Sequence, residues 1–153
     1  MTGHPSKQDL VFAYERGCSR AAHESMIDNS PSDLALQRIF VEGNIVDKFA
    51  RDSIFSEGVT VTTVDINQAA TETSALMGNE TVTRINQATF VTPNGEATRL
   101  DSIVRSNGKW IHEEVKSGTH PNDKYVFDAL VSTDRAERAG LEVEKVRLIT
   151  INV

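Results

Sequence analysis

The stretch that decides the fold runs Arg99-Leu100-Asp101-Ser102-Ile103-Val104-Arg105, then Asn107-Gly108, then Lys109-Trp110-Ile111-His112-Glu113-Glu114-Val115-Lys116-Ser117. Both flanking segments are rich in β-branched and apolar residues, which predicts two strands, and the Asn-Gly pair favours a tight turn between them. This hairpin brings Asp101 near Glu114. Because side chains alternate faces along a strand, Glu114 and Lys116 point to one side and Val115 points to the other.

Two ionised carboxylates held together repel each other, and a cation between them removes that repulsion. Oxygen ligands favour a hard ion. Mg²⁺ suits the pattern because one or two carboxylates usually hold it and it keeps several waters, and Mn²⁺ can substitute. Such an ion activates water and neutralises charge on a phosphate. We therefore expect a metal-dependent phosphodiesterase site in which Asp101 and Glu114 hold the ion and Lys116 orients the attacking water.

Length and charge limit the alternatives. With 153 residues, of which 39% are hydrophobic, the chain is expected to form one domain over residues 1–153, and a longer parent protein is left open. The net charge of −6 counts against broad, charge-driven nucleic-acid binding. A local basic cleft is compatible with that charge, and its candidate residues are Arg99, Arg105, Lys109, Lys116, Lys124 and Arg135.

The cellular compartment is suggested by features that the sequence lacks. A single cysteine, Cys18, can form no internal disulfide and cannot by itself hold zinc or an iron–sulfur cluster, which favours a reducing compartment. No apolar leader stands at the N-terminus, and no stretch approaches the roughly 20 apolar residues that cross a bilayer. We expect a soluble, cytoplasmic protein without membrane contact.

The remaining pattern predicts an α/β fold with a mixed sheet. The last helix is expected to be a crossover that lets the final strand join the sheet in parallel. The expected helices are 6–25, 33–55, 65–77 and 121–139, and the expected strands are 59–64, 82–92, 97–105, 109–117 and 143–153.

With these elements in place, the chain resembles the PD-(D/E)XK nuclease superfamily, within it the RecB-like nuclease branch. The resemblance is carried by 99–104, 110–119, 139–141 with 148–152, and more weakly by 16–20 and Glu42-Gly43. It implies a restriction-endonuclease-like core, DNA as the substrate and Mg²⁺ or Mn²⁺ as the cofactor. It also implies a metal site of Asp101, Glu114 and the Val115 carbonyl, with Asp47 as a further ligand and Lys116 assisting the water.

Asp47 can also be judged from its neighbours. On a helical wheel it falls among apolar residues, where an unpaired carboxylate is costly and a metal would neutralise it. The alternatives are a hydrogen-bonded acid at the edge of the core, or Glu42 as the ligand instead. His112 and His120 either line the cleft or are structural, and Gln87 on the first strand stays undecided. The stripe that contains Asp47 consists of Leu36, Phe40, Gly43, Asp47, Ala50 and Ile54.

The chain departs from the family at three places, one of which is Glu113, where relatives usually carry an apolar residue. Many relatives carry a Gln-x-x-x-Tyr pair where this chain has Ser132 and Ala136, and relatives with an iron–sulfur cluster use four cysteines. No cluster is therefore expected. A second hypothesis is a catalytically inactive nuclease-fold module that binds nucleic acid or protein within a larger DNA-processing assembly. A third is a plain scaffold domain.

Overall fold

The computed structural model describes residues 43–152. Residues 43–49 are α-helical and run directly into a π-helical segment, η1 (Ala50–Ile54). The elements that follow are β1 (Val59–Thr60), α4 (Ile66–Gly78), β2 (Arg84–Val91), β3 (Ala97–Ser106), β4 (Lys109–Ser117), α5 (Asp123–Arg138) and β5 (Val143–Ile151). The expected helix 6–25, with Cys18, lies outside the described residues, as do Glu42 and the first part of the expected helix 33–55.

The five strands form one mixed sheet in the order β1-β2-β3-β4-β5. Strands β2, β3 and β4 are an antiparallel meander, and β5 lies parallel to β4 after the crossover through α5. This confirms the α/β class and the parallel final strand. A second crossover was not expected: β1 pairs in parallel with β2 through α4, and β1 covers only two residues of the stretch 59–64.

The turn between β3 and β4 has the conformation that its sequence favours. Asn107 has φ 50° and Gly108 has φ 78°. Positive φ at both central residues is the type I′ turn, whose twist matches that of antiparallel strands. Pairing then runs from Ser106 with Lys109 to Ser102 with Glu113. The turn therefore sets the register that places the charged residues of the two strands.

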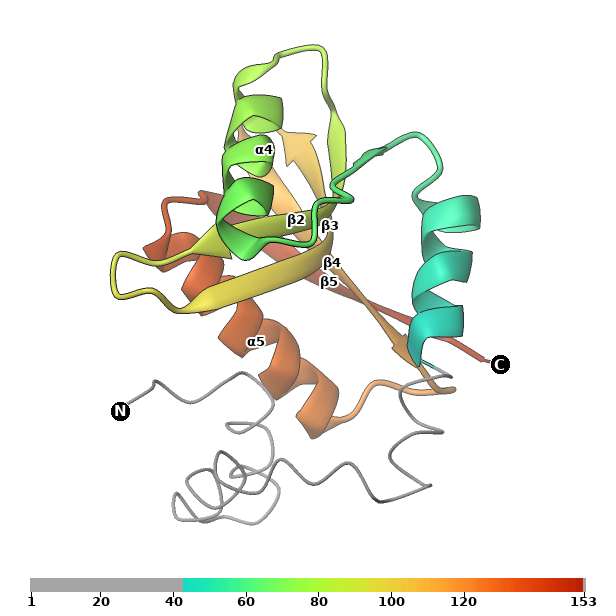
Figure 1. Cartoon of the computed structure of the whole chain (residues 1–153). Helices are drawn as coiled ribbons and strands as arrows, with labels where there is room; N and C mark the ends of the chain where they lie inside the picture. Colours follow the sequence, from blue (N-terminus) through green and yellow to red (C-terminus); the bar gives the residue numbers. More distant parts are fainter. Residues whose placement is uncertain (1–42, 153) are drawn as a thin grey trace.

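Helices cover the sheet, as Figure 1 shows, with α4 packed on β2 and α5 packed on β3 and β5. Small buried residues on α5, Ala129, Ser132 and Ala136, let this helix approach the strands closely. The main core lies between these elements. Its buried members are Val61, Ala69, Val82, Ile85, Ala88, Phe90, Leu100, Ile103, Trp110, Ala136 and Leu141.

A second apolar cluster joins the helix at 43–49 to the ends of β4 and β5. Val46, Ala50, Phe55 and Val115 are its buried members. Phe55 N–H donates to the Ala50 carbonyl at 2.8 Å, the i to i+5 bond of a π-helical turn. That wider turn puts Phe55 where a regular helix would put Ile54. The expected stripe is therefore wrong at two places, because Ile54 is 41% exposed and Gly43 is also exposed.

Among residues 43–152, no helix is both long enough and apolar enough to cross a membrane.

Candidate metal centre

The hairpin places Asp101 beside Glu114. Ser102 pairs with Glu113 and Ile103 with His112, and one further step in this register sets Asp101 opposite Glu114. The Val115 N–H donates to Asp101 Oδ2 at 2.8 Å, which fixes the orientation of that carboxylate. Glu114 is 2% exposed. The two acids predicted from the hairpin therefore lie together, and one of them is deeply buried.

Asp101 lies in a strongly negative environment. Burial, followed by the charges of Glu114 and Asp47, raises its pKa from 3.8 to about 8, while the Val115 N–H and Lys116 act in the opposite direction. A carboxyl that is hard to ionise beside two other acids is a group that a cation would stabilise. The contribution of Asp47 comes from the helix at 43–49, so this helix brings a third acid close enough to act electrostatically on Asp101.

Asp47 lies at the edge of this region. Its side chain is 33% exposed, and its Oδ2 is 3.6 Å from Arg51 Nη1, one helical turn away. This matches the alternative of an acid at the rim of the buried face better than that of a fully buried one. A partly exposed carboxylate can change partners at small cost, because surface ion pairs of this kind contribute little to stability.

Lys116 is held between two acids. Its Nζ lies 2.9 Å from Glu114 Oε1 and also donates to Asp128 Oδ2 on α5. Burial by itself would lower the pKa of Lys116, but attraction by Glu114 and Asp128 outweighs it, so the pKa is raised. The side chain is therefore a fixed ammonium group at neutral pH. It can orient a water or stabilise negative charge, and it is unsuited to accept a proton.

His112 contacts Oε2 of Glu114, while Lys116 contacts Oε1. Its Nε2 is 3.1 Å from Glu114 Oε2, and its Nδ1 is 2.8 Å from Thr133 Oγ1. The Thr133 hydroxyl also lies 2.8 Å from the Ala129 carbonyl, so one hydroxyl group on α5 contacts both this carbonyl and His112 Nδ1. His112 is fully buried and orients Glu114 rather than lining an open cleft. His120 is exposed and contacts its neighbour Thr119, which places it outside this cluster.

The carboxylate oxygens of Asp101 and Glu114 are the kind of ligand that a hard cation prefers, but they do not by themselves complete a coordination shell. Within the described part of the chain, no three His, Cys, Asp or Glu side chains lie close enough to hold a metal ion. Both oxygens of Glu114 already contact His112 and Lys116. Mg²⁺ needs only one or two carboxylates, with water filling the remaining positions. Asp101 and Glu114 supply two such carboxylates, and one oxygen of Glu114 would have to exchange its present contact to bind an ion.

Gln87 has an unusual backbone conformation beside the site. Its φ is 57°, although it is not a glycine and lies inside β2. Asn86 pairs with Ser102 and Ala88 with Leu100, so Gln87 falls opposite Asp101 without forming a ladder pair. Residues in this left-handed region cost free energy and are concentrated at functional sites. No sequence signal identified this strain, because a Gln in a strand ordinarily has negative φ.

Other functional candidates also escaped the sequence reasoning. Asp128 and Thr133 lie on α5, where they contact Lys116 and His112 of β4, so only the packing of α5 against the sheet reveals them. Glu113 faces away from Glu114 and binds Arg84 and, at 3.0 Å, Arg147. The signal for this second ion network was the unexpected charge at position 113 in a buried strand.

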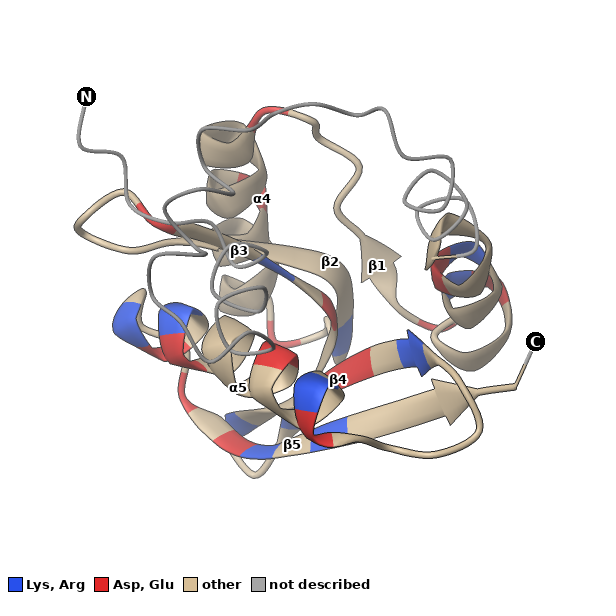
Figure 2. Cartoon of the chain, turned by 90° about the horizontal axis from the view of Figure 1, so that it is seen from below, with Lys and Arg blue, Asp and Glu red and all other residues tan. Residues whose placement is uncertain are grey.

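The expected basic cleft does not form as one surface. Lys109 and Arg105 lie at the turn end of the hairpin, while Lys116 is at the other end of β4, roughly 20 Å away at about 3.3 Å per residue. Arg99, Arg105 and Arg135 each donate to backbone carbonyl groups of the protein itself. Figure 2 shows basic and acidic segments interspersed along β4, β5 and α5.

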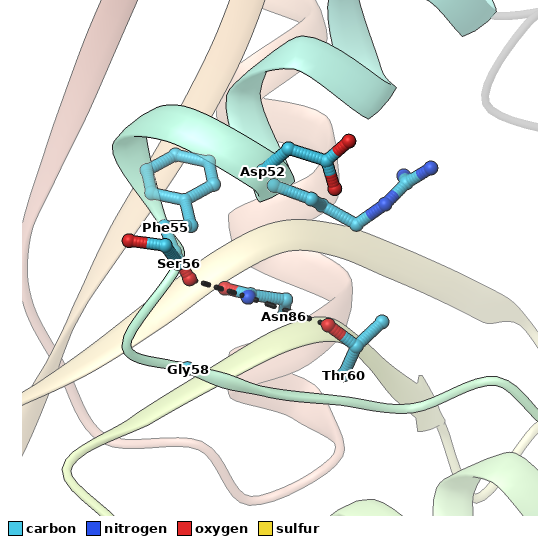
Figure 3. Close-up of a pocket in the computed structure, with 7 residues that line it drawn as sticks. Asp52, Phe55, Ser56, Gly58, Thr60 and Asn86 are labelled. Carbon is cyan, nitrogen blue, oxygen red and sulfur yellow. Dashed lines mark hydrogen bonds between the residues drawn. The ribbon is translucent and has the colours of Figure 1, made fainter.

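The described residues also form a polar cavity. Its volume is about 600 Å³, and its lining comes from the end of the helix, the following turn, β1 and β2 (Figure 3). Asn86 lies between the turn and β1, with its Nδ2 donating to the Phe55 carbonyl at 2.9 Å. The residues that line it are Arg51, Asp52, Phe55, Ser56, Gly58, Thr60 and Asn86.

Comparison with known proteins gives no family: no family model matches the chain, and no curated protein sequence matches it.

Proposed function

We propose that this protein is a divalent-metal-dependent nuclease that hydrolyses DNA phosphodiester bonds. The observation that carries the proposal is the meeting of Asp101, Glu114 and Lys116 at one end of the β3–β4 hairpin, with Asp47 acting on Asp101 from the helix. Burial and neighbouring negative charge raise the pKa of Asp101 to about 8. Such a cluster is costly to ionise without a cation, which supports a metal as its natural partner.

Each residue has a distinct role in this proposal. Asp101, Glu114 and the Val115 carbonyl would hold Mg²⁺ or Mn²⁺, with Asp47 completing the ligand set. The ion would supply an activated water and shield the charge that grows on the phosphate. Lys116, kept charged by Glu114 and Asp128, would orient the attacking water and stabilise the phosphate oxygens. His112 would keep Glu114 in place.

The resemblance to RecB-like PD-(D/E)XK nucleases supports the same roles, and the meander, crossover helix and parallel strand are compatible with their core. Enzymes of this kind work in the cytoplasm on DNA, often within larger DNA-processing assemblies. The net charge of −6 suits an enzyme that binds DNA through a metal and a few local contacts rather than through a broad basic surface.

The direct test is a cleavage assay. Purified protein is incubated with end-labelled single-stranded and double-stranded DNA in Mg²⁺, in Mn²⁺ and in EDTA. We expect metal-dependent cleavage that is lost in Glu114→Gln and retained in Glu144→Gln, an exposed glutamate on β5. Cleavage that survives in Glu114→Gln at the wild-type rate would remove the assignment.

A second candidate function is an inactive nuclease-fold module that binds nucleic acid or a protein partner. Two observations favour it. The described residues contain no compact group of three metal-ligating side chains. The Gln and Tyr positions of the relatives are filled by Ser132 and Ala136, both buried against the sheet. Calorimetry with Mn²⁺ separates the two functions, because the module should show no heat of binding that depends on Asp101.

A further inference from the structure

The cavity beside the candidate metal centre has polar groups of two kinds. Arg51, Ser56 and Thr60 contribute hydrogen-bond donors, and the Arg51 side chain is 29% exposed. The lining also includes the carboxylate of Asp52, whose charge is paired with Lys48 one helical turn away. Asn86 is 1% exposed and contributes an acceptor, because its Nδ2 is used by the Phe55 carbonyl and its Oδ1 has no partner among the described residues. A buried acceptor without a donor is unusual in proteins and points to a missing partner.

The hydrogen bond from Nδ2 to the Phe55 carbonyl fixes the orientation of the Asn86 amide. Exchanging the nitrogen and oxygen of Asn86 would place Oδ1 against the Phe55 carbonyl, so two acceptors would face each other. Gly58 also constrains the group, since a Cβ at position 58 would lie 2.6 Å from Asn86 Nδ2 and 2.9 Å from Arg84 carbons. The absence of a side chain at Gly58 therefore lets its backbone pack closely against Asn86. Nδ2 therefore faces the Phe55 carbonyl, and Oδ1 is the atom left without a partner among the described residues.

Two links connect the lining of the cavity to residues of the metal centre. On the helix, Arg51 pairs with Asp47, and Asp47 is one of the charges that act on Asp101. In the sheet, Asn86 precedes Gln87, which falls opposite Asp101. Both links end at the carboxylate of Asp101. These links are the reason to expect that a ligand bound at the metal centre extends toward the cavity.

Ligand chemistry follows from this arrangement. Donors such as a guanidinium and hydroxyl groups suit phosphate oxygens, whereas an amide oxygen suits the N–H groups of a base. A volume of about 600 Å³ falls within the range of small-molecule pockets. We propose that this cavity holds one unstacked nucleotide of the DNA strand, with a phosphate toward Arg51 and the base toward Asn86. This inference rests on the proposed nuclease function and adds a preference for single-stranded or frayed ends.

The preference has a simple physical reason. A base inside a duplex is paired and stacked, and it must leave the stack before it can enter a protein pocket. A single strand carries no such cost. Duplex DNA without free ends is therefore expected to bind less tightly than a single strand of the same length.

The test uses two variants with the same added bulk. Ser56→Phe adds a ring to an exposed residue that lines the cavity, and Glu57→Phe adds the same ring to an exposed neighbour that does not line it. Thermal unfolding of each variant is the check that both are folded. Binding is measured by fluorescence anisotropy in Ca²⁺, with a labelled oligothymidine strand and a strand of equal length that lacks bases.

We expect wild-type protein and Glu57→Phe to bind oligothymidine about tenfold more tightly than the baseless strand, which corresponds to the contribution of one well-held base. Ser56→Phe should lose this discrimination and bind both strands alike. Equal binding of both strands by wild type, or equal discrimination by both variants, would overturn the nucleotide site. Base-dependent binding without any cleavage in Mg²⁺ would instead remove the nuclease function and leave the site in place.

Discussion

The ammonium group of Lys116 lies 2.9 Å from Oε1 of Glu114, two residues earlier on the same face of β4. Asp128 on α5 holds the same ammonium group from the other side. The cation and the acid are therefore kept together by the sheet and by the helix that crosses it. This arrangement is the basis for the roles proposed above, and each of its contacts can be removed separately.

Replacing Lys116 by alanine should slow DNA cleavage by about 10²–10⁴-fold, because the group that orients water and stabilises the phosphate oxygens is lost. The measurement is the single-turnover cleavage rate in Mg²⁺. Lys145→Ala, an exposed lysine on β5, is the control and should cleave at the wild-type rate. Equal slowing of both variants would mean that Lys116 acts only through the overall charge.

Removing the charge of Asp101 should stabilise the metal-free protein at alkaline pH. The pKa of Asp101 is about 8 in the folded state against 3.8 ordinarily, so the folded chain binds more protons than the unfolded chain between these values. Stability must then fall as the pH rises from about 4 to 8. Asp101→Asn keeps an acceptor for the Val115 N–H and removes this loss, which amounts to about 5 kcal/mol at pH 8 for a shift of this size.

Urea unfolding of wild type and Asp101→Asn at several pH values in EDTA measures this effect. Added Mn²⁺ should restore the stability of the wild type at pH 8 and leave Asp101→Asn unchanged, because a ligand stabilises only the state that binds it. Parallel pH curves for the two proteins would contradict the assigned environment of Asp101.

Asp128→Asn should change the pH dependence of cleavage. Attraction by Glu114 and Asp128 raises the pKa of Lys116 despite its burial, so removal of one acid lowers that pKa. Lys116 then loses its proton at a lower pH, and the alkaline limb of the pH–rate profile should move to lower pH. Asp134→Asn, on the exposed side of α5, is the control. A profile that only decreases in height, without moving, would indicate a structural role for Asp128.

Glu113 and Glu114 are adjacent but should give opposite phenotypes. Glu113→Gln weakens the pairing with Arg147, whose side chain is half exposed, and with Arg84, whose side chain is largely buried, and should cost about 2 kcal/mol of stability. The activity of its folded fraction should stay close to that of wild type. Glu114→Gln should abolish cleavage, and part of its cost in stability is offset because the repulsion between Glu114 and Asp101 is removed. Unfolding curves and cleavage rates on the same samples make the comparison, and loss of activity in both would contradict the separation of the two faces.

The hairpin and the acids on it could be predicted from the sequence because their signals are local. The Asn107-Gly108 pair defines a type I′ turn, the turn sets the register, and alternation along β4 then puts Glu114 and Lys116 on one face. The helix over Asp123–Arg138 and the parallel strand after it were also clear from their end signals.

The rest depends on packing between distant segments. The π-helical turn at Ala50–Ile54 replaces Ile54 by Phe55 in the core, and a helical wheel assumes that the turn is regular. Asp128 contacts Lys116 only because α5 packs across the sheet, and the sequence does not show this packing. The strained conformation of Gln87 and the unsatisfied oxygen of Asn86 arise from tertiary contacts, for which the residue type alone gives no signal.

The most direct test of the central claim is crystallography of the protein soaked in Mn²⁺, with data collected for the anomalous signal of the metal. The account predicts a Mn²⁺ peak between the carboxylates of Asp101 and Glu114, about 2.1 Å from an oxygen of each. A map without a peak at this position, at a Mn²⁺ concentration that supports cleavage, would contradict it.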